Sequence, residues 1–355
     1  MKYYLGLLCL STKSYAALSN ENGDIITFIN APPLTLQVDP QLRNHLYETI
    51  NQLSINLGIN YDDLIKNIKY SCISMSGLYT ENSKKVIMQI LFQLGFSKIN
   101  NIVLCENGHA HLATELLSHG GVVRAGTGSL VFIRSKYLCD TPIRVDGWGS
   151  LLGDDGSGYD LGRKCLRVLF KAEDKRKPGS SILKNRVLDY IGLNSKINDI
   201  YDLVQWHYDI RYTVGWRSSI SNLAVPLREA AENDKDPLAY KIMMSGINSL
   251  IDSFNTAIEL MQSKNKGENT ESIPLILHGG LFNNSKIYNS QFRKYLSELP
   301  PSNIDFKVIK PELNSVVGCL ALAISRNEFI DKTCRYHCVL RESATRLKIF
   351  YNKHN

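Results

Sequence analysis

Strand-like and helix-like segments alternate along the chain, and this alternation predicts an α/β fold. Residues 68–77 and 101–108 have the apolar character of buried strands, and residues 84–95 between them have the spacing of a helix. A strand, a tight turn and a second strand at 122–133 repeat the arrangement with which the chain opens. The sequence therefore predicts one α/β architecture that occurs twice.

The opening stretch MKYYLGLLCLSTKSYAALSNENGDII admits three interpretations: an export signal, a hairpin of a cytoplasmic domain, or a nucleotide loop that has lost its glycines. The apolar run Leu5–Leu10 is shorter than the ~7–15 residues of an export signal, and polar residues interrupt it at 11–14. The segment NENGD at 20–24 is typical of an Asn-Gly turn between strands. These features favour the hairpin.

Size and composition are those of an ordinary globular protein, because 44% of the 355 residues are hydrophobic and 21% are charged. The length is sufficient for two domains with separate cores. No apolar run approaches the ~18 residues of a membrane span, so we expect a soluble protein with no membrane partner. The eight cysteines are dispersed, which favours reduced thiols and a cytoplasmic location.

The net charge of +7 is compatible with anionic small-molecule substrates. Lysines and arginines are dispersed and no nucleic-acid-binding motif accompanies them, so a nucleic-acid partner is not expected. The densest basic segment, KAEDKRKPGS at 171–180, contains two acidic residues and ends in Pro-Gly, which predicts a solvated loop. The segments HAH at 109–111 and CRYHC at 334–338 lack a complete ligand set, so no metal-ligating residues are predicted.

Three glycine-rich turns follow or join the predicted strands, at 125–129, 147–158 and 278–284. Glycine accepts backbone conformations that other residues avoid and has no side chain to keep a ligand away. Such turns can present backbone N–H groups to a phosphate or a sugar. Each of these segments alone is also explained as a simple turn. The order of the three turns and the residues beside them are a more specific sign of ligand binding.

The chain resembles the N-acetylglucosamine kinases and the BadF/BcrA-type ATPases of the actin-like and sugar-kinase superfamily. The resemblance extends from Tyr3 to about Ser325 and is carried by GTGS at 126–129, DGWGSLLGDDGSGYDLGR at 146–163, DPLA at 236–239, GGLFNN at 279–284 and SVVGCLALA at 315–323. It implies two ribonuclease-H-like α/β domains around a central cleft, residues 1–118 and 119–324. A C-terminal helix within 325–355 is expected to pack on the first domain.

The resemblance also implies ATP and Mg²⁺ as cofactors and a small sugar as the substrate, with a homodimer left open. Glu106, at the end of a strand, is the residue that matches the family's catalytic aspartate. The substrate-binding residues implied in this way are Ser76, Gly77, Asn107, Trp148, Gly149 and Asp154. The nucleotide-binding residues implied are Thr12, Lys13, Gly126, Thr127, Gly128, Ser129, Gly279, Gly280 and Asn283.

The first phosphate loop departs from the family pattern. If Thr12 and Lys13 match the end of that loop, then Leu8 stands where the family has an acid, and residues 9–11 (Cys, Leu, Ser) stand where it has three glycines. Leucine cannot hold a metal-bound water, and the side chains of Cys9 and Leu10 would crowd a phosphate. The segment NAPPLT at 30–35 also differs from the expected sugar-contacting turn.

Two functions therefore stay open. The chain is either an ATP-dependent kinase for a hydroxyl of an amino sugar or a related small molecule, or a kinase-like protein that binds sugar or nucleotide as a sensor or a partner subunit. The intact second and third glycine turns favour ligand binding, and the loss of the acid at Leu8 favours weak catalysis.

Overall fold

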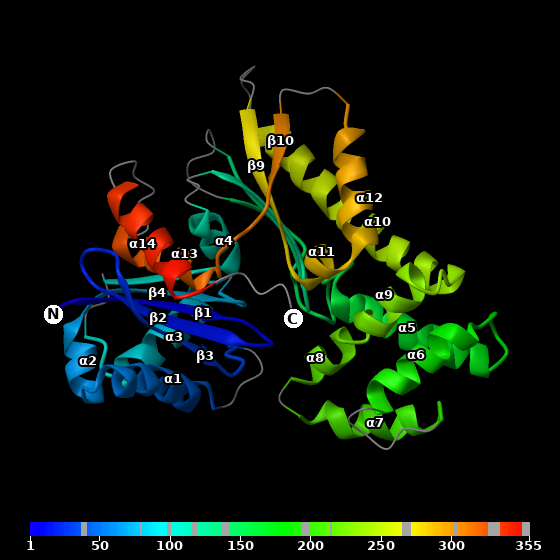
Figure 1. Cartoon of the computed structure of the whole chain (residues 1–355), viewed down its shortest axis with the longest axis horizontal. Coiled ribbons are helices and arrows are strands. Elements are labelled where there is room, and N and C mark those ends of the chain that lie inside the picture. The colour runs from blue at the N-terminus through cyan, green and yellow to red at the C-terminus, as the bar shows by residue number, and fades with distance from the viewer. Residues whose placement is uncertain are drawn as a thin grey trace. The chain divides into compact units, whose positions relative to one another are not determined.

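The computed structural model describes residues 1–36, 41–78, 80–97, 101–115, 119–135, 142–192, 199–213, 215–264, 271–300, 304–325 and 334–349. The chain divides into two compact units (Figure 1). Of the described residues, the first unit contains those in 1–119 and 310–349, and the second contains those in 120–309.

The first unit is built on a five-stranded mixed sheet. Its strands are β1 (Tyr3–Cys9), β2 (Ser14–Ser19), β3 (Ile25–Ala31), β4 (Ile68–Met75) and β5 (Ile102–Cys105). They lie in the order β3-β2-β1-β4-β5, with β1, β2 and β3 antiparallel and β1, β4 and β5 parallel. The predicted hairpin is confirmed, and the Asn20 side chain holds the turn between β2 and β3 by accepting the N–H groups of Asn22 and Asp24, both at 2.9 Å.

Helices cover both faces of this sheet because alternate residues of its strands are apolar on both sides. The helices of this unit are α1 (Leu42–Leu57), α2 (Tyr61–Asn67), α3 (Glu81–Gln93), α4 (Asn107–Thr114), α13 (Val316–Ser325) and α14 (Cys334–Arg346). On β1, Leu5 and Leu7 face the cluster that contains α1 and α3, and Leu8 faces the cluster that contains α4 and α13. Figure 1 shows α1 and α3 on one side of the sheet and α13 on the other.

The second unit repeats the topology of the first. Its strands are β6 (Gly120–Ala125), β7 (Ser129–Arg134), β8 (Ile143–Val145), β9 (Glu271–His278) and β10 (Ile304–Ile309). Read from β8, their order is β8-β7-β6-β9-β10, with the antiparallel and parallel pairs in the same places as in the first sheet. The predicted duplication is confirmed.

Helices of the second unit lie mostly between β8 and β9 in the sequence. They are α5 (Gly158–Glu173), α6 (Ser181–Gly192), α7 (Asp202–Arg211), α8 (Trp216–Ser221), α9 (Ala224–Glu232), α10 (Pro237–Lys264), α11 (Gly280–Asn284) and α12 (Lys286–Ser297). Asp236 caps α10 by accepting the N–H of Ala239 at 2.7 Å, as its position before a proline suggests. The buried face of α10 packs in the core with α5, α9 and α12.

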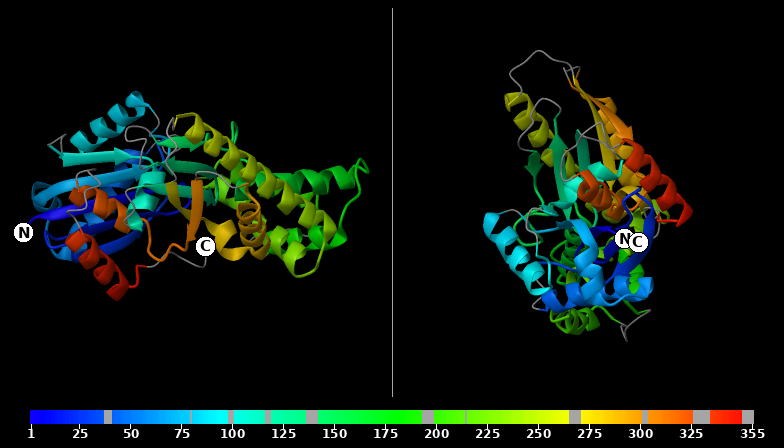
Figure 2. Two further views of the ribbon diagram at one scale, coloured as in Figure 1. Left: turned by 90° about the horizontal axis from the view of Figure 1, so that it is seen from above. Right: turned by 90° about the vertical axis from the view of Figure 1, so that its left-hand side faces the viewer.

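The expected end of the second domain at residue 324 needs correction, because the structure assigns residues 310–325 to the first unit. The reason is that α13 packs on β1, β4 and α4, so its small apolar side chains complete the core of the first sheet. The described C-terminal helix, α14, is shorter than the expected range 325–355 and packs on α13 and β3. Both views of Figure 2 show α14 beside α13.

Cysteines 9, 72, 105, 165 and 319 are buried free thiols. In the part of the chain that the structure describes, no helix is both long and apolar enough to cross a membrane.

Candidate functional site

Polar residues gather where β4 and β5 end in the first unit. The buried side chain of Asn107 accepts the Ser74 hydroxyl at 2.7 Å and donates to the Ser76 hydroxyl at 2.9 Å. Glu106 is half-buried and occupies the N-cap position of α4, directly after β5. Because β4 and β5 are parallel, their carboxyl ends bring Ser76, Asn107 and Glu106 to one edge of the sheet, where open α/β sheets bind ligands. Gly77 follows Ser76 in this turn.

The turn between β1 and β2, the expected first phosphate loop, follows two buried side chains at the end of β1, Leu8 and Cys9. Leu8 is only 2% exposed and packs in the apolar cluster that contains residues of α13. The Ser14 hydroxyl oxygen accepts the N–H groups of Leu10 and Leu34 at 3.2 and 3.0 Å, which closes the turn. Cys9 is fully buried, and burial raises the pKa of its thiol far above the usual value. This turn therefore presents neither a carboxylate at Leu8 nor a glycine surface.

Thr12 and Lys13 lie at the tip of the same turn. Thr12 is exposed, and the Lys13 ammonium lies 5.7 Å from the centre of the Tyr15 ring. These are the nucleotide-binding candidates that belong to the first unit.

The turn between β6 and β7 has a different construction. The Ser129 N–H donates to Asp154 Oδ1 at 3.2 Å, and the Ser129 hydroxyl donates to Asp146 Oδ2 at 2.7 Å. A Cβ atom on Gly128 would lie 2.8 Å from Asp154 Oδ1, so only glycine lets this carboxylate reach the turn. Among the described residues, the N–H groups of Thr127 and Gly128 have no hydrogen-bond partner. Two backbone donors are thus available at this turn for an anion.

Two buried carboxylates, Asp146 and Asp154, lie under this turn. The Asp154 N–H donates to Asp146 Oδ1 at 2.8 Å. Burial, and next the charge of Asp146, raise the pKa of Asp154 to about 6, while the Ser129 N–H, Arg124 and Arg217 oppose the rise. The ionised form of Asp154 is therefore costly without a partner, and a cation or a ligand hydroxyl beside it would stabilise that form.

The third glycine turn contacts the second. Gly279 has φ of 112°, and a Cβ atom there would lie 2.4 Å from the carbonyl oxygen of Ala125. Gly280 begins α11, and the N–H of the exposed Asn283 donates to the Gly279 carbonyl at 3.1 Å. The nucleotide-binding candidates of the second unit are thus brought together at the carboxyl edge of β6 and β9.

The N-terminus of α5 also meets the second glycine turn. The N–H groups of Gly158 and Tyr159 donate to the carbonyls of Gly126 and Thr127 at 2.7 and 3.3 Å. Ser157 caps the helix by accepting the Asp160 N–H at 3.2 Å. These bonds fix the position of the turn against a long helix.

The substrate-binding candidates of the loop 146–158 separate into two groups. Trp148 is 57% exposed, and the Arg144 guanidinium stacks over its ring at 4.5 Å. Gly149 has φ of 95° and open space around its Cα. Asp154, by contrast, is buried against Gly128 of the neighbouring turn, a nucleotide-binding candidate.

Asp146 was missed as a candidate residue, although it stands immediately before the Gly-Trp-Gly motif. Its position in the sequence gives no sign that its carboxylate accepts hydrogen bonds from both Ser129 and Asp154. Ser74 was missed for a similar reason, because a serine inside a buried strand carries no motif.

The described ranges contain no group of three or more His, Cys, Asp or Glu side chains arranged to hold a metal ion. His111 of the HAH segment is buried, and its Nδ1 lies 2.7 Å from the hydroxyl of Ser315, the residue directly before α13. The side chains of the CRYHC segment lie outside the described residues.

Residues 11–323 match the model of the BadF/BadG/BcrA/BcrD ATPase family. The chain belongs to this family. The match begins at Ser11, so Leu8, Cys9 and Leu10 lie outside it.

Curated relatives of this ATPase-family chain include two kinases. N-acetylmuramic acid/N-acetylglucosamine kinase of Clostridium acetobutylicum is 25% identical over 328 residues, which cover 92% of this chain and 99% of that protein. N-acetyl-D-glucosamine kinase of Dictyostelium discoideum is 27% identical over 298 residues, which cover 78% of this chain and 86% of that protein.

A solved structure of a candidate N-acetylglucosamine kinase from Chromobacterium violaceum superposes with a TM-score of 0.62 at 19% identity, covering 91% of this chain and 99% of that one. This likeness confirms the expected fold.

Proposed function

We propose that this protein transfers a phosphoryl group from ATP to a hydroxyl of an amino sugar of the N-acetylglucosamine type. The observation that carries the proposal is the turn at 126–129, where two backbone N–H groups with no partner among the described residues stand beside Asp154 and Asp146. The names of the two curated relatives support the choice of an amino sugar as the acceptor.

Phosphoryl transfer requires mainly that the phosphates be held and the acceptor hydroxyl be oriented. We assign the phosphates to the N–H groups of Thr127 and Gly128 and the adenosine to the Gly279-Gly280 turn. Glu106 is the general base that accepts the proton of the acceptor hydroxyl, a role that requires hydrogen-bond reach. Asn107 keeps the neighbouring polar side chains in position through its two hydrogen bonds to serines.

Mg²⁺ is usually held by one or two carboxylates, water and substrate phosphates rather than by a complete protein cage. Asp154 and Asp146 fit this requirement, because both carboxylates lie at the glycine turn and one of them is destabilised in its ionised form. When bound, the ion would neutralise charge on the phosphates.

The test is ADP release by the purified protein with Mg-ATP and N-acetylglucosamine, N-acetylmuramic acid, glucosamine or glucose. Turnover is expected only with amino sugars. Glu106→Gln should lower kcat about 10²–10⁴-fold, because general-base catalysis contributes about that much. Glu81→Gln, the same change on the exposed first turn of α3, should leave kcat unchanged. Equal turnover in Glu106→Gln and the parent would remove Glu106 from the mechanism.

A second function remains a candidate because Leu8 is buried in an apolar cluster where the family has an acid. In that case the protein binds sugar or nucleotide without efficient turnover. Calorimetry separates the two functions: binding of N-acetylglucosamine and ADP without ADP release from ATP would support the second one.

A further inference from the structure

A groove of about 640 Å³ lies in the second unit between α5, α7 and α8. Residues of the three glycine-rich turns do not line it. One wall is formed by α5, which contributes Tyr159, Leu166 and Phe170 as well as the cations Arg163, Arg167 and Lys171. These cations are four residues apart, so they follow one another along one face of the helix at about 6 Å intervals.

Among the described residues, few acidic side chains pair with the cations of this wall. Within the described ranges, Arg167 and Lys171 form no ion pair. Arg163 lies 3.6 Å from Asp160, but the same carboxylate is already paired with Lys164 at 2.7 Å. The Nε atom of Arg163 is buried and has no acceptor in the described part of the chain.

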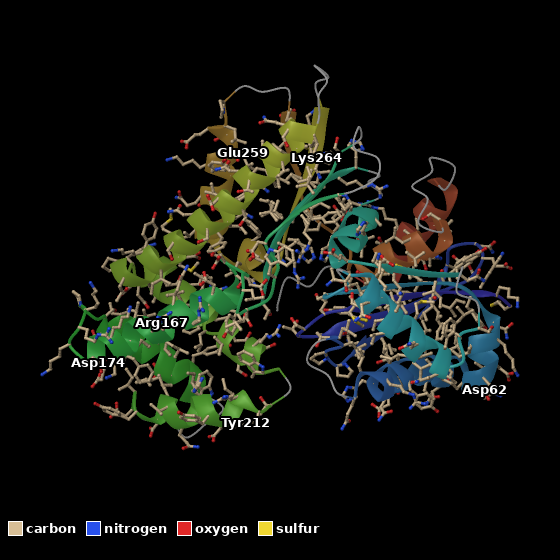
Figure 3. All side chains as sticks on the ribbon, turned by 180° about the vertical axis from the view of Figure 1, so that it is seen from behind. Asp62, Arg167, Asp174, Tyr212, Glu259 and Lys264 are labelled. Carbon is tan, nitrogen blue, oxygen red and sulfur yellow. The ribbon has the colours of Figure 1, made fainter. Side chains whose placement is uncertain are left out.

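Helix stability does not account for this row of cations. Like charges four residues apart destabilise a helix. The helix dipole favours basic residues in the last turn, which explains Lys171 but neither Arg163 nor Arg167. Asp174 is the acidic residue of the lining, and it faces Arg176, a fourth cation of the groove, at 3.7 Å. Figure 3 labels Arg167 on α5 and Asp174, which directly follows the last residue of that helix.

The opposite wall of the groove is apolar and aromatic. It is formed by Leu203, Val204, His207 and Tyr208 of α7 and by Ile220 of α8. The rings of His207 and Tyr208 meet edge to face with centres 5.4 Å apart, and Tyr208 is 51% exposed. A groove with cations on one wall and exposed rings on the other fits a ligand that has an anionic group and a flat or apolar body.

We propose that this groove binds an organic phosphate, with its phosphoryl group on Arg167 and Lys171 and its apolar or aromatic part on Val204 and Tyr208. The volume lies within the ~300–1,000 Å³ of small-molecule sites. The segment 171–180, expected from the sequence to be a solvated loop, contributes Lys171, Asp174 and Arg176 to this groove. The site does not depend on the proposed kinase activity.

The test is calorimetry on the full-length protein with three phosphates: phenyl phosphate, AMP and N-acetylglucosamine 6-phosphate. Phenol, adenosine and N-acetylglucosamine are the matched ligands without phosphate. Each titration is repeated with saturating Mg-ADP, so that binding at the proposed nucleotide site is separated from binding in the groove. Comparing the three affinities shows whether the groove prefers a phosphate attached to an aryl group, a nucleoside or a sugar.

The variant Arg167→Glu/Lys171→Glu should weaken binding of the preferred phosphate at least tenfold, both with and without Mg-ADP. The matched control is Lys175→Glu/Lys177→Glu, which makes the same change of charge at exposed positions that do not line the groove. Its affinity should stay within twofold of the parent. If the first variant fails to fold by circular dichroism, Arg167→Gln/Lys171→Gln replaces it.

Three outcomes would overturn the proposal. The first is that none of the three phosphates binds the parent protein. The second is that both double variants weaken binding equally. The third is that Mg-ADP abolishes the binding and neither variant affects it.

Discussion

The turn between β1 and β2 and the turn between β6 and β7 occupy the same place in two sheets of the same strand order. At the first turn, the Ser14 hydroxyl accepts the N–H groups of Leu10 and Leu34, and Leu8, near the end of β1, is buried in an apolar cluster. The second turn places two carboxylates beside glycines and leaves the N–H groups of Thr127 and Gly128 without partners in the described structure.

The difference between the turns shows that the same backbone arrangement is stable with or without a ligand-binding surface. In the first turn, the side chain at position 8 is a buried, uncharged leucine. In the second, burial of Asp154 and its closeness to Asp146 are retained although they oppose ionisation. Costly buried charge of this kind is more typical of functional sites than of packing. The buried pair Asp146 and Asp154 is therefore the feature that distinguishes the second turn from the first.

The largest expected effect comes from restoring an acid to the first turn. Leu8→Asp should lower the free energy of unfolding by about 3–5 kcal/mol, because it removes buried apolar contacts and places a carboxyl group among them. We expect it to lower ADP release rather than raise it. Urea unfolding and the ADP-release assay measure the two effects.

Leu8→Met is the control for this change, since it keeps the volume and the apolar character and should cost less than about 1.5 kcal/mol. An increase in turnover by Leu8→Asp, with stability close to that of the parent, would show that the first turn is a phosphate loop that lacks only its acid.

The second effect concerns Asp154, whose pKa is raised to about 6 in the folded protein from the ordinary value of 3.8. Between pH 3.8 and about pH 6, the Asp154 carboxyl group is ionised in the unfolded chain but still protonated in the folded protein. The free energy of unfolding therefore falls as the pH rises from about 4 to about 6, and it stays lower above pH 6. Asp154→Asn should remove this decline and stabilise the protein by about 2–3 kcal/mol at pH 7. It should also weaken binding of Mg-ADP. Urea unfolding from pH 4 to pH 8 measures the stability.

Asp305→Asn makes the same chemical change at an exposed position of β10, and its unfolding should follow the pH dependence of the parent. If Asp154→Asn followed the parent as well, the Asp154 carboxylate would carry no cost of ionisation, and the contrast between the two turns would be lost.

Much of this contrast could be predicted from the sequence, because glycine patterns and the loss of an acid are visible in single residues. The duplicated architecture was predicted from the repeated strand–turn–strand pattern, and Asn107 and Ser76 could be named because the family resemblance implies them. The self-closure by Ser14 was not predicted, since it depends on Leu34, which lies 20 residues away. Nor was α13 assigned to the first unit, because a helix of small apolar residues can pack on either sheet.

The smallest effects come from Ser14 and Ser129, which begin β2 and β7 and allow the same substitution in both turns. Ser14→Ala leaves the buried N–H groups of Leu10 and Leu34 without this acceptor, and Ser129→Ala leaves Asp146 without this donor. Each change should cost about 1–3 kcal/mol of stability.

Their effects on nucleotide binding should differ. Ser129→Ala disturbs the carboxylates beside Thr127 and Gly128, so the Kd for Mg-ADP should rise several-fold, whereas Ser14→Ala should leave that Kd within twofold of the parent. Urea unfolding and calorimetry on the two variants give both quantities. A larger loss of Mg-ADP affinity in Ser14→Ala than in Ser129→Ala would contradict the contrast, because the first turn would then contribute more to nucleotide binding than the second.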